Sequence, residues 1–240
     1  MKSLYKAIQD QFRDKKPLCA PTADEWAARR EEMVEIQIRR RGVADSDVLE
    51  ALRCVPRHHF VVEENRLDAY EDKPLPIGVG QTISQPYIVA AMTAALALRG
   101  HERVLEIGTG CGYQAAILSH LAKEVFSVER HAELAKAASK LLSDLGYENV
   151  RVHCGDGTFG FEKFAPFDAI LVAAAAPALP PPLVAQLAEG GRLIIPIGGA
   201  EHQQLKLFRR HGEATTCTPL EACRFLPLIG YYGVQETCER

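Results

Sequence analysis

A glycine-rich turn between two apolar runs is the feature that most constrains how this chain folds. Residues 103–130 read RVLEIGTGCGYQAAILSHLAKEVFSVER. The apolar run 104–107 is of strand type, three glycines follow at alternate positions, and residues 113–122 place apolar side chains at helical spacing. A second strand-like run, residues 125–128, ends at Glu129. The stretch therefore predicts a strand, a tight turn, a helix and a second, parallel strand that ends at an acidic residue.

The acids around this turn indicate which ligand it binds. Glycines permit close backbone approach, and a helix that begins at the turn directs free N–H groups at the ligand. Glu129 follows Gly108 by 21 positions, near the roughly 20-residue offset that places an acid on ribose hydroxyls. Unlike the dinucleotide fingerprint G-x-G-x-x-G, the pattern here is E-x-G-x-G-x-G, and the Glu106 carboxylate would suit a sulfonium better than a pyrophosphate. S-adenosylmethionine is favoured, while another adenosine ligand or a purely structural turn stays open.

Further apolar and periodic segments extend this unit into a sheet. We expect helices over residues 134–145 and 180–187, parallel strands over 150–153, 167–174 and 192–197, and antiparallel edge strands over 205–208 and 222–228. Because strands alternate with helices, the sequence predicts an α/β fold with a Rossmann-like, doubly wound and mostly parallel sheet. The antiparallel strands would close its C-terminal edge.

The N-terminal part of the chain predicts helices. Thr22 begins a capping box, and the helix that it starts would run to Gly42. A second helix would start at Asp45. His58 and His59 come next, and we interpret them as structural, because adjacent side chains on an extended chain point to opposite sides and chelate poorly.

These patterns define the expected organisation of the chain. Residues 1–21 are mixed and polar, which predicts a loosely ordered arm. Residues 22–240 would form one domain, in which residues 22–80 supply a helical extension and substrate-side loop and residues 81–240 the cofactor-binding α/β core. Within the extension, residues 69–80 are rich in Pro and Gly without a regular period, so we expect a long ordered loop that lines a site.

Two polar positions have both a structural and a functional explanation. Ser84 lies in the hexapeptide QTISQP, ahead of an apolar helix in which Pro86 suits the first turn. Its hydroxyl would either cap that helix or help to receive an anion. Asp156, between two glycines, would either form a tight turn or lie beside Glu129 and accept a hydrogen bond from an adenine amino group.

Composition narrows the partners and the compartment. A formal net charge of −3 gives no general attraction to nucleic acid or anionic membrane. None of the seven cysteines forms a C-x-x-C pair, which is typical of free thiols in a reducing cytosol. Residues 1–16 lack the apolar core of a signal peptide, and prolines interrupt the longest apolar stretch, residues 169–185. We therefore expect a cytoplasmic protein with no membrane or nucleic acid partner.

Several blocks together resemble one family. In order they are VLEALRCVPRHHFV, PLPIGVGQTISQPYIVAAM, VLEIGTGCGYQAAIL, CGDG, FDAILVAAAAP and GGRLIIPIG. They resemble protein-L-isoaspartate O-methyltransferases over roughly residues 33–230. The glycine turn alone would indicate only a class I methyltransferase. The combination of QTISQP with VPRHHFV indicates a much narrower group of proteins.

The resemblance implies methyl transfer from S-adenosylmethionine to the α-carboxyl of L-isoaspartyl residues, and more weakly to D-aspartyl residues, in damaged proteins and peptides. S-adenosylhomocysteine would be the product. The family's active-site serine falls on Ser84, and no metal site is implied. The family's cofactor contacts fall on Thr82, Ile83, Gly108, Gly110, Glu129, Arg130, Asp156 and Gly157. Isoaspartyl proteins and peptides are then the expected partners of a protein that we expect to be a monomer.

Two positions depart from the family pattern, and two other functions stay open. Cys111 stands where the turn usually has serine, and Ala173 where threonine is common; both are small, so we expect activity to be kept. One alternative is a methyltransferase for a different carboxylate. The other is a non-catalytic protein that binds S-adenosylmethionine.

Overall fold

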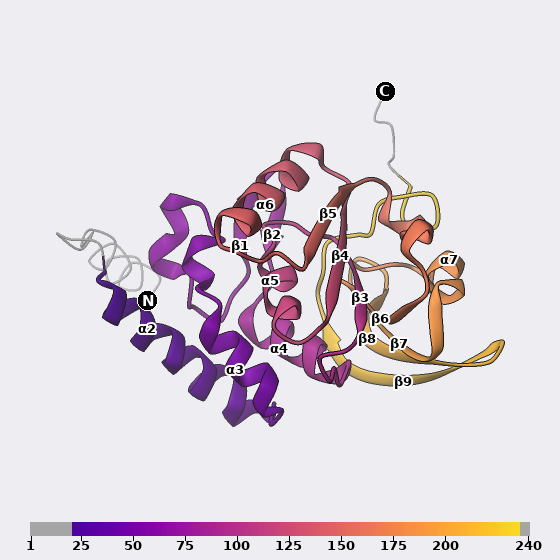
Figure 1. Ribbon diagram of the computed structural model, residues 1–240, viewed down its shortest axis with the longest axis horizontal. Coiled ribbons are helices and arrows are strands. Elements are labelled where there is room, and N and C mark those ends of the chain that lie inside the picture. Colours follow the sequence, from indigo (N-terminus) through magenta and orange to yellow (C-terminus); the bar gives the residue numbers. More distant parts are fainter. Residues whose placement is uncertain (1–20, 236–240) are drawn as a thin grey trace, which may run out of the picture.

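The computed structural model describes residues 21–235 of the chain. Helices occupy its N-terminal part, and a seven-stranded sheet with flanking helices follows (Figure 1). The arm expected over residues 1–21 lies outside the described range, apart from Pro21. Within that range, no helix has both the length and the apolar character needed to cross a membrane.

Local signals set the N-terminal helices. The helical elements there are α2 (Ala23–Glu32), the π-helical turn η1 (Met33–Ile38), the 3-10 turn η2 (Arg39–Arg41) and α3 (Ser46–Cys54). Both halves of the capping box form, because Thr22 N donates to the Glu25 carboxylate at 2.6 Å and Glu25 N donates to the Thr22 hydroxyl at 3.3 Å. Gly42, with φ +102°, ends the first helical run, and the Asp45 carboxylate caps α3. Both predicted helices are confirmed.

The sheet has the order β5-β4-β3-β6-β7-β8-β9. Its strands are β3 (Arg103–Ile107), β4 (Glu124–Glu129), β5 (Val150–Cys154), β6 (Phe167–Val172), β7 (Leu187–Gly198), β8 (Gln203–His211) and β9 (Ala214–Cys223). Pairing is parallel from β5 through β7 and antiparallel at β7–β8 and β8–β9. The predicted α/β fold with antiparallel C-terminal strands is confirmed. The chain order reverses beside β3, so the carboxyl ends of β3 and β4 lie where open α/β sheets bind ligands.

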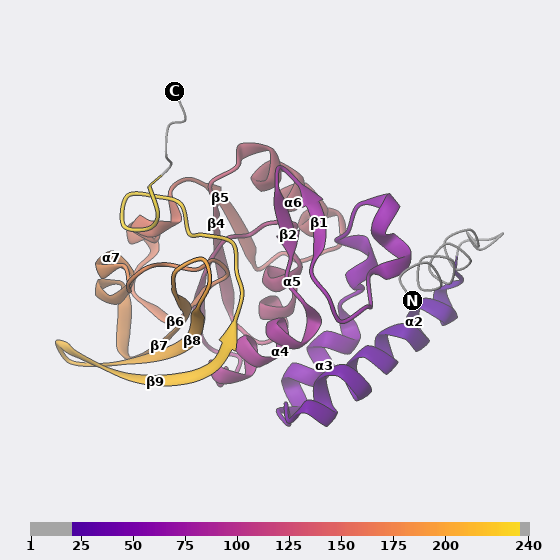
Figure 2. The same cartoon turned by 180° about the vertical axis from the view of Figure 1, so that it is seen from behind.

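Helices cover both faces of this sheet (Figures 1 and 2). They are α4 (Pro86–Ala95), α5 (Tyr113–Ser119) and α6 (Ala132–Asp144) on one face and α7 (Pro181–Ala185) on the other. Alternate strand residues point to opposite faces, so Val104 packs in the same cluster as Trp26 and Met33, whereas Leu105 packs with Leu183 of α7. Since one core joins the helical extension to the sheet, we propose that the described residues form one domain.

Three sequence-based boundaries were wrong. Within residues 69–80, expected to be a loop, β1 (Leu75–Gly78) pairs with β2 (Gln81–Ile83) in an antiparallel hairpin with a bulge; Pro76 is tolerated because the ladder has only two strands. β7 begins at Leu187, ahead of the expected start at 192. The last strand is residues 214–223 instead of 222–228; it is mostly exposed, so it carries no core-facing pattern.

Four short 3-10 turns complete the described elements. They are η3 (Arg57–His59), η4 (Glu63–Asp68), η5 (Gly157–Phe159) and η6 (Glu162–Phe164). Because η3 is a 3-10 turn, the backbone at His58 and His59 is not extended as expected. The two rings meet edge to face with centroids 4.4 Å apart. His58 stacks on Trp26 and hydrogen bonds to the Tyr70 hydroxyl at 2.8 Å, and burial lowers its pKa to about 4. Its contacts are those of a structural side chain.

Candidate active site

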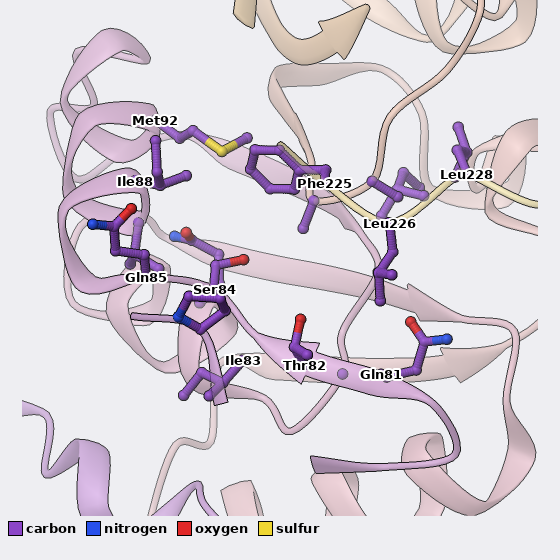
Figure 3. Close-up of a pocket in the computed structure, with 18 of the residues that line it drawn as sticks. Gln81, Thr82, Ile83, Ser84, Gln85, Ile88, Met92, Phe225, Leu226 and Leu228 are labelled. Atoms are coloured by element: carbon purple, nitrogen blue, oxygen red, sulfur yellow. The ribbon is translucent and has the colours of Figure 1, made fainter. Parts of the chain in front are cut away.

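A pocket of about 980 Å³ lies at the carboxyl ends of β3 and β4. Its lining comes from the β2–α4 segment, the glycine turn, the end of β4, and the chain from Glu221 to Ile229. In Figure 3, Ser84 and Ile88 lie on the opposite side of this space from Leu226 and Leu228. Segments far apart in the sequence therefore enclose a single cavity.

The glycine turn forms the part of the wall that follows β3. Gly108 and Gly110 have φ values of +93° and +55°, which L side chains rarely adopt. A Cβ on Gly108 would lie 3.6 Å from the Cβ of Ala173, which is ordinary contact, so the positive φ and not crowding favours glycine at 108. Cys111 lines the same wall, and burial raises the pKa of its thiol to about 11, which keeps it protonated at neutral pH.

Glu129 is fixed at the end of β4 beside this turn. One carboxylate oxygen accepts a hydrogen bond from Gly110 N and the other from His131 N, both at 2.9 Å. The side chain is buried yet lines the pocket. Because a carboxylate has about four acceptor sites, each oxygen keeps capacity for another donor. Glu129 can thus accept two ligand hydroxyls without losing its backbone contacts.

Glu106 lies beneath the turn and does not face the ligand space. It is fully buried, and Ser127 hydrogen bonds to its carboxyl group. The Ser127 hydroxyl is also hydrogen bonded to that of Thr109 at 2.5 Å. Burial raises the pKa of Glu106 to about 8, so the group is mostly protonated at neutral pH. The expectation that its charge meets a sulfonium is therefore wrong, because the carboxyl group is buried and is not among the pocket-lining residues.

Thr82, Ile83 and Ser84 line the pocket where β2 leads into α4. The N-cap of α4 is Gln85, and no side chain caps this helix end. Ser84 precedes the N-cap, and its hydroxyl makes no hydrogen bond to any residue in the range 21–235. The capping explanation of Ser84 is therefore wrong, and the hydroxyl is available to a ligand.

The remaining cofactor candidates lie at the other end of the pocket. Arg130 and Gly157 line it, whereas Asp156 is not among the lining residues. One Asp156 oxygen accepts hydrogen bonds from Thr158 N and Oγ1, and the other accepts one from Tyr231 N at 2.8 Å. A Cβ on Gly157 would lie 2.4 Å from Ile107 Cγ2, so only glycine brings the chain this close to β3. Asp156 therefore holds the turn in which Gly157 reaches the pocket.

Side chains from four segments meet at the pocket beside α4, and sequence reasoning missed them. The Arg41 guanidinium lies 3.5 Å from the Tyr87 ring centroid and pairs with Asp72 at 2.8 Å. The Tyr87 hydroxyl donates to Glu221 at 2.8 Å. Arg41, Tyr87 and Glu221 line the pocket. No local motif could have identified this cluster, because its members are distant in the sequence.

Among residues 21–235, no group of three or more His, Cys, Asp or Glu side chains is arranged to hold a metal ion. The five cysteines in that range are unpaired. The groups that line the described pocket include the free Ser84 hydroxyl, the fixed Glu129 carboxylate, the side chains of Arg41, Tyr87 and Glu221, and backbone groups.

Comparison with known proteins agrees with this geometry. The family model for protein-L-isoaspartate(D-aspartate) O-methyltransferase matches residues 28–232. The protein-L-isoaspartate O-methyltransferase of Methanoculleus marisnigri is 54% identical over 214 residues, 89% of this chain and 97% of the relative. The protein-L-isoaspartate O-methyltransferase 1 of Syntrophobacter fumaroxidans is 54% identical over 204 residues, which are 85% and 95% of the two chains.

Solved structures of similar fold include members of the same family. One protein-L-isoaspartate O-methyltransferase superposes with a TM-score of 0.78 at 33% identity, covering 85% of this chain and 67% of the other. A Plasmodium falciparum structure described as the same enzyme type, in complex with S-adenosyl-L-homocysteine, has a TM-score of 0.73 at 26% identity and covers 83% and 98%. The chain therefore belongs to the protein-L-isoaspartate(D-aspartate) O-methyltransferase family.

Proposed function

We propose that the protein transfers a methyl group from S-adenosylmethionine to the α-carboxylate of L-isoaspartyl residues, and more weakly of D-aspartyl residues. The substrates are damaged proteins and peptides, and the ester begins their repair. The observation that carries this proposal is that the free Ser84 hydroxyl and the fixed Glu129 carboxylate line the same pocket. Family membership supports it.

The pocket residues suit S-adenosylmethionine. Glu129 would accept hydrogen bonds from the ribose hydroxyls, because both its oxygens are oriented by backbone N–H groups and keep free acceptor sites. Backbone at Gly108 and Gly110 would lie against the amino acid part. Gly157 and Asp156 would lie near the adenine. Contacts from Thr82, Ile83 and Arg130 complete the proposed set.

The reaction requires little acid–base catalysis by the protein. A carboxylate whose pKa in water is about 3.9 is already ionised at pH 7 and needs no general base. Bound S-adenosylmethionine supplies an electrophilic methyl group on its sulfonium. The protein must align the carboxylate oxygen with that group, and such orientation can contribute up to about 7–11 kcal/mol. Ser84 would donate a hydrogen bond that orients the acceptor carboxylate without binding it so tightly that attack slows.

An isomeric-peptide assay tests the proposal. Methyl incorporation is measured with an isoaspartyl peptide and with its aspartyl isomer of the same sequence. We expect methylation of the first only, with a base-labile ester as product. A protein that methylates another carboxylate would leave both peptides unmodified and still turn over a different acceptor. A non-catalytic protein would bind S-adenosylmethionine and yield no S-adenosylhomocysteine with any acceptor.

We further propose that the protein acts as a monomer in the cytoplasm, with no nucleic acid or membrane partner. Unpaired thiols at all five described cysteines support a reducing compartment. The net charge of −3 offers no general attraction to polyanions. Measuring the mass in solution by light scattering tests the oligomeric state.

A further inference from the structure

Arg57 is a fully buried cation behind the wall that carries Ser84. Its Nε donates to the Ala69 carbonyl and its Nη2 to the Ser84 carbonyl, both at 2.7 Å. The guanidinium carbon lies 4.8 Å from the Tyr113 ring centroid. One side chain thus connects the turn η3, the chain after η4 and the segment between β2 and α4.

The burial of an arginine at this position calls for an explanation. A buried charge is costly unless it is paired, and here the acceptors are neutral carbonyls. Within residues 21–235, no carboxylate lies within ion-pair distance of Arg57, and its Nη1 has no hydrogen-bond partner. The hydroxyl of Tyr113, a pocket residue, is buried and interacts electrostatically with Arg57, although neither group has a partner of full hydrogen-bond geometry. The guanidinium therefore has a specific local task.

That task is visible in the backbone at Ser84. The β1–β2 ladder ends at Ile83, and the helical hydrogen bonds of α4 begin with the Gln85 carbonyl, which accepts from Val89 N. The Ser84 carbonyl lies between the two patterns and has no strand or helix partner of its own. A carbonyl partly removed from water is stabilised by a donor, and Arg57 supplies one. The position of Ser84 is thus set by a side chain 27 residues away.

Arg57 can fix this position because its own turn is anchored. The neighbouring His58 ring stacks on Trp26 with centroids 4.5 Å apart and hydrogen bonds to Tyr70 at 2.8 Å. A guanidinium presents its donors in a rigid fork, so one group can hold the Ala69 and Ser84 carbonyls together. A lysine ammonium is a point charge on a flexible stem and would hold this geometry less well.

We propose that Arg57 is a positioning residue for methyl transfer: by holding the Ser84 carbonyl, its guanidinium fixes the Ser84 hydroxyl where that group orients the acceptor carboxylate. This inference rests on the proposed function. Arg57 does not line the pocket and touches two residues that do, Ser84 through a hydrogen bond and Tyr113 through its ring. In this proposal, its effect on turnover passes through Ser84. We expect the binding of S-adenosylmethionine at Glu129 and the glycine turn to depend on Arg57 less than turnover does, because its hydrogen bonds go to the Ala69 and Ser84 carbonyls.

A double-mutant cycle tests this coupling. The proteins are wild type, Arg57→Lys, Ser84→Ala and the double variant, with Arg53→Lys as a matched control, because Arg53 lies on α3 and pairs with Glu31 and Glu35 away from the pocket. The readouts are kcat and KM for an isoaspartyl peptide, the Kd for S-adenosylmethionine by calorimetry, and Tm. Assays run below the lowest Tm.

We expect Arg57→Lys to lower kcat by about threefold to tenfold. The loss should not exceed that of Ser84→Ala, because the effect is exerted through the Ser84 hydroxyl. Its Kd for S-adenosylmethionine should stay within about twofold. In the Ser84→Ala background its effect on kcat should fall below about twofold. Three results would overturn the inference. In the first, Arg57→Lys lowers kcat by the same factor with and without the Ser84 hydroxyl. In the others, Arg57→Lys weakens S-adenosylmethionine binding as much as it lowers kcat, or Ser84→Ala leaves turnover unchanged. If Arg57→Lys does not fold, Arg57→Gln, whose amide can still donate to one carbonyl, carries the same cycle. Failure of the proposed function is a separate result, since wild type would then leave the isoaspartyl peptide unmethylated.

Discussion

The two walls of the pocket are built in different ways. The cofactor wall comprises the lining residues within 82–83, 108–114, 129–131 and 157, and the acceptor wall those within 84–92 and 221–229. Backbone at the ends of neighbouring parallel strands makes most of the first. The second is assembled from segments that side chains tie together. One wall thus follows from the sheet itself, and the other depends on long-range contacts.

Each wall is supported by one buried ionisable group, and the two groups differ in their charge. Glu106 supports the glycine turn and is neutralised by protonation, since burial raises its pKa to about 8. Arg57 supports Ser84 and stays charged, because burial lowers an arginine pKa only from a very high value. The contrast indicates that the cofactor wall and the acceptor wall can be broken separately.

The largest effect should come from the cofactor wall. Glu129→Gln removes the charge that we propose orients the ribose, and hydrogen bonds to a charged group contribute about 1.5–3 kcal/mol each. We expect the Kd for S-adenosylmethionine to rise about tenfold to a hundredfold, with the peptide KM at saturating cofactor little changed. Calorimetry measures the Kd, and Glu133→Gln, exposed on α6, is the control. Equal affinity in both variants would show that Glu129 does not hold the cofactor.

The matching change in the acceptor wall is Ser84→Ala. We expect kcat to fall about tenfold, because one hydrogen bond to a carboxylate is lost, while the Kd for S-adenosylmethionine stays within about twofold. Steady-state kinetics with an isoaspartyl peptide checks this, and Ser143→Ala, exposed on α6, should behave as wild type. Unchanged turnover would remove Ser84 from the mechanism.

A third prediction concerns the pH dependence of stability that Glu106, the buried residue behind the cofactor wall, should cause. Glu106 holds its proton to about pH 8 in the folded protein, whereas the unfolded chain loses it near 4.5. The folded state therefore binds the extra proton in this window, and the free energy of unfolding should fall as pH rises, by at most about 1.4 kcal/mol per pH unit. Urea unfolding at pH 5, 6, 7 and 8 should show this decline in wild type and a flatter profile in Glu106→Gln. Parallel profiles would mean that Glu106 is ionised throughout.

The smallest effect should appear at the side of the acceptor wall. Tyr87→Phe removes the hydrogen bond to Glu221 and keeps the ring under Arg41. A single hydrogen bond contributes about 0.5–1.5 kcal/mol net, so we expect the peptide KM to rise about twofold to tenfold, with kcat and S-adenosylmethionine affinity unchanged. Kinetics at varied peptide concentration measures this. A fall in kcat with constant KM would place Tyr87 in the alignment step instead.

Local pattern was sufficient where local geometry decides the structure. The capping box at Thr22, the cap at Asp45 and the alternating strands were predictable, because each depends on a few neighbouring residues or on one periodicity. The boundaries of β9 were not, since a strand exposed on both faces has no hydrophobic alternation to mark it. The β1–β2 hairpin was missed because proline and glycine hide a short ladder.

The sequence by itself determined the parallel sheet, the glycine turn and the place of Glu129 at a strand end, because continuous apolar runs and glycine spacing constrain the backbone directly. Only the tertiary structure decided that the Ser84 hydroxyl is free of the helix cap, that Glu106 is buried and that Arg57 holds the Ser84 carbonyl. These properties depend on contacts between segments brought together by packing, and no local pattern encodes which polar groups such packing removes from water.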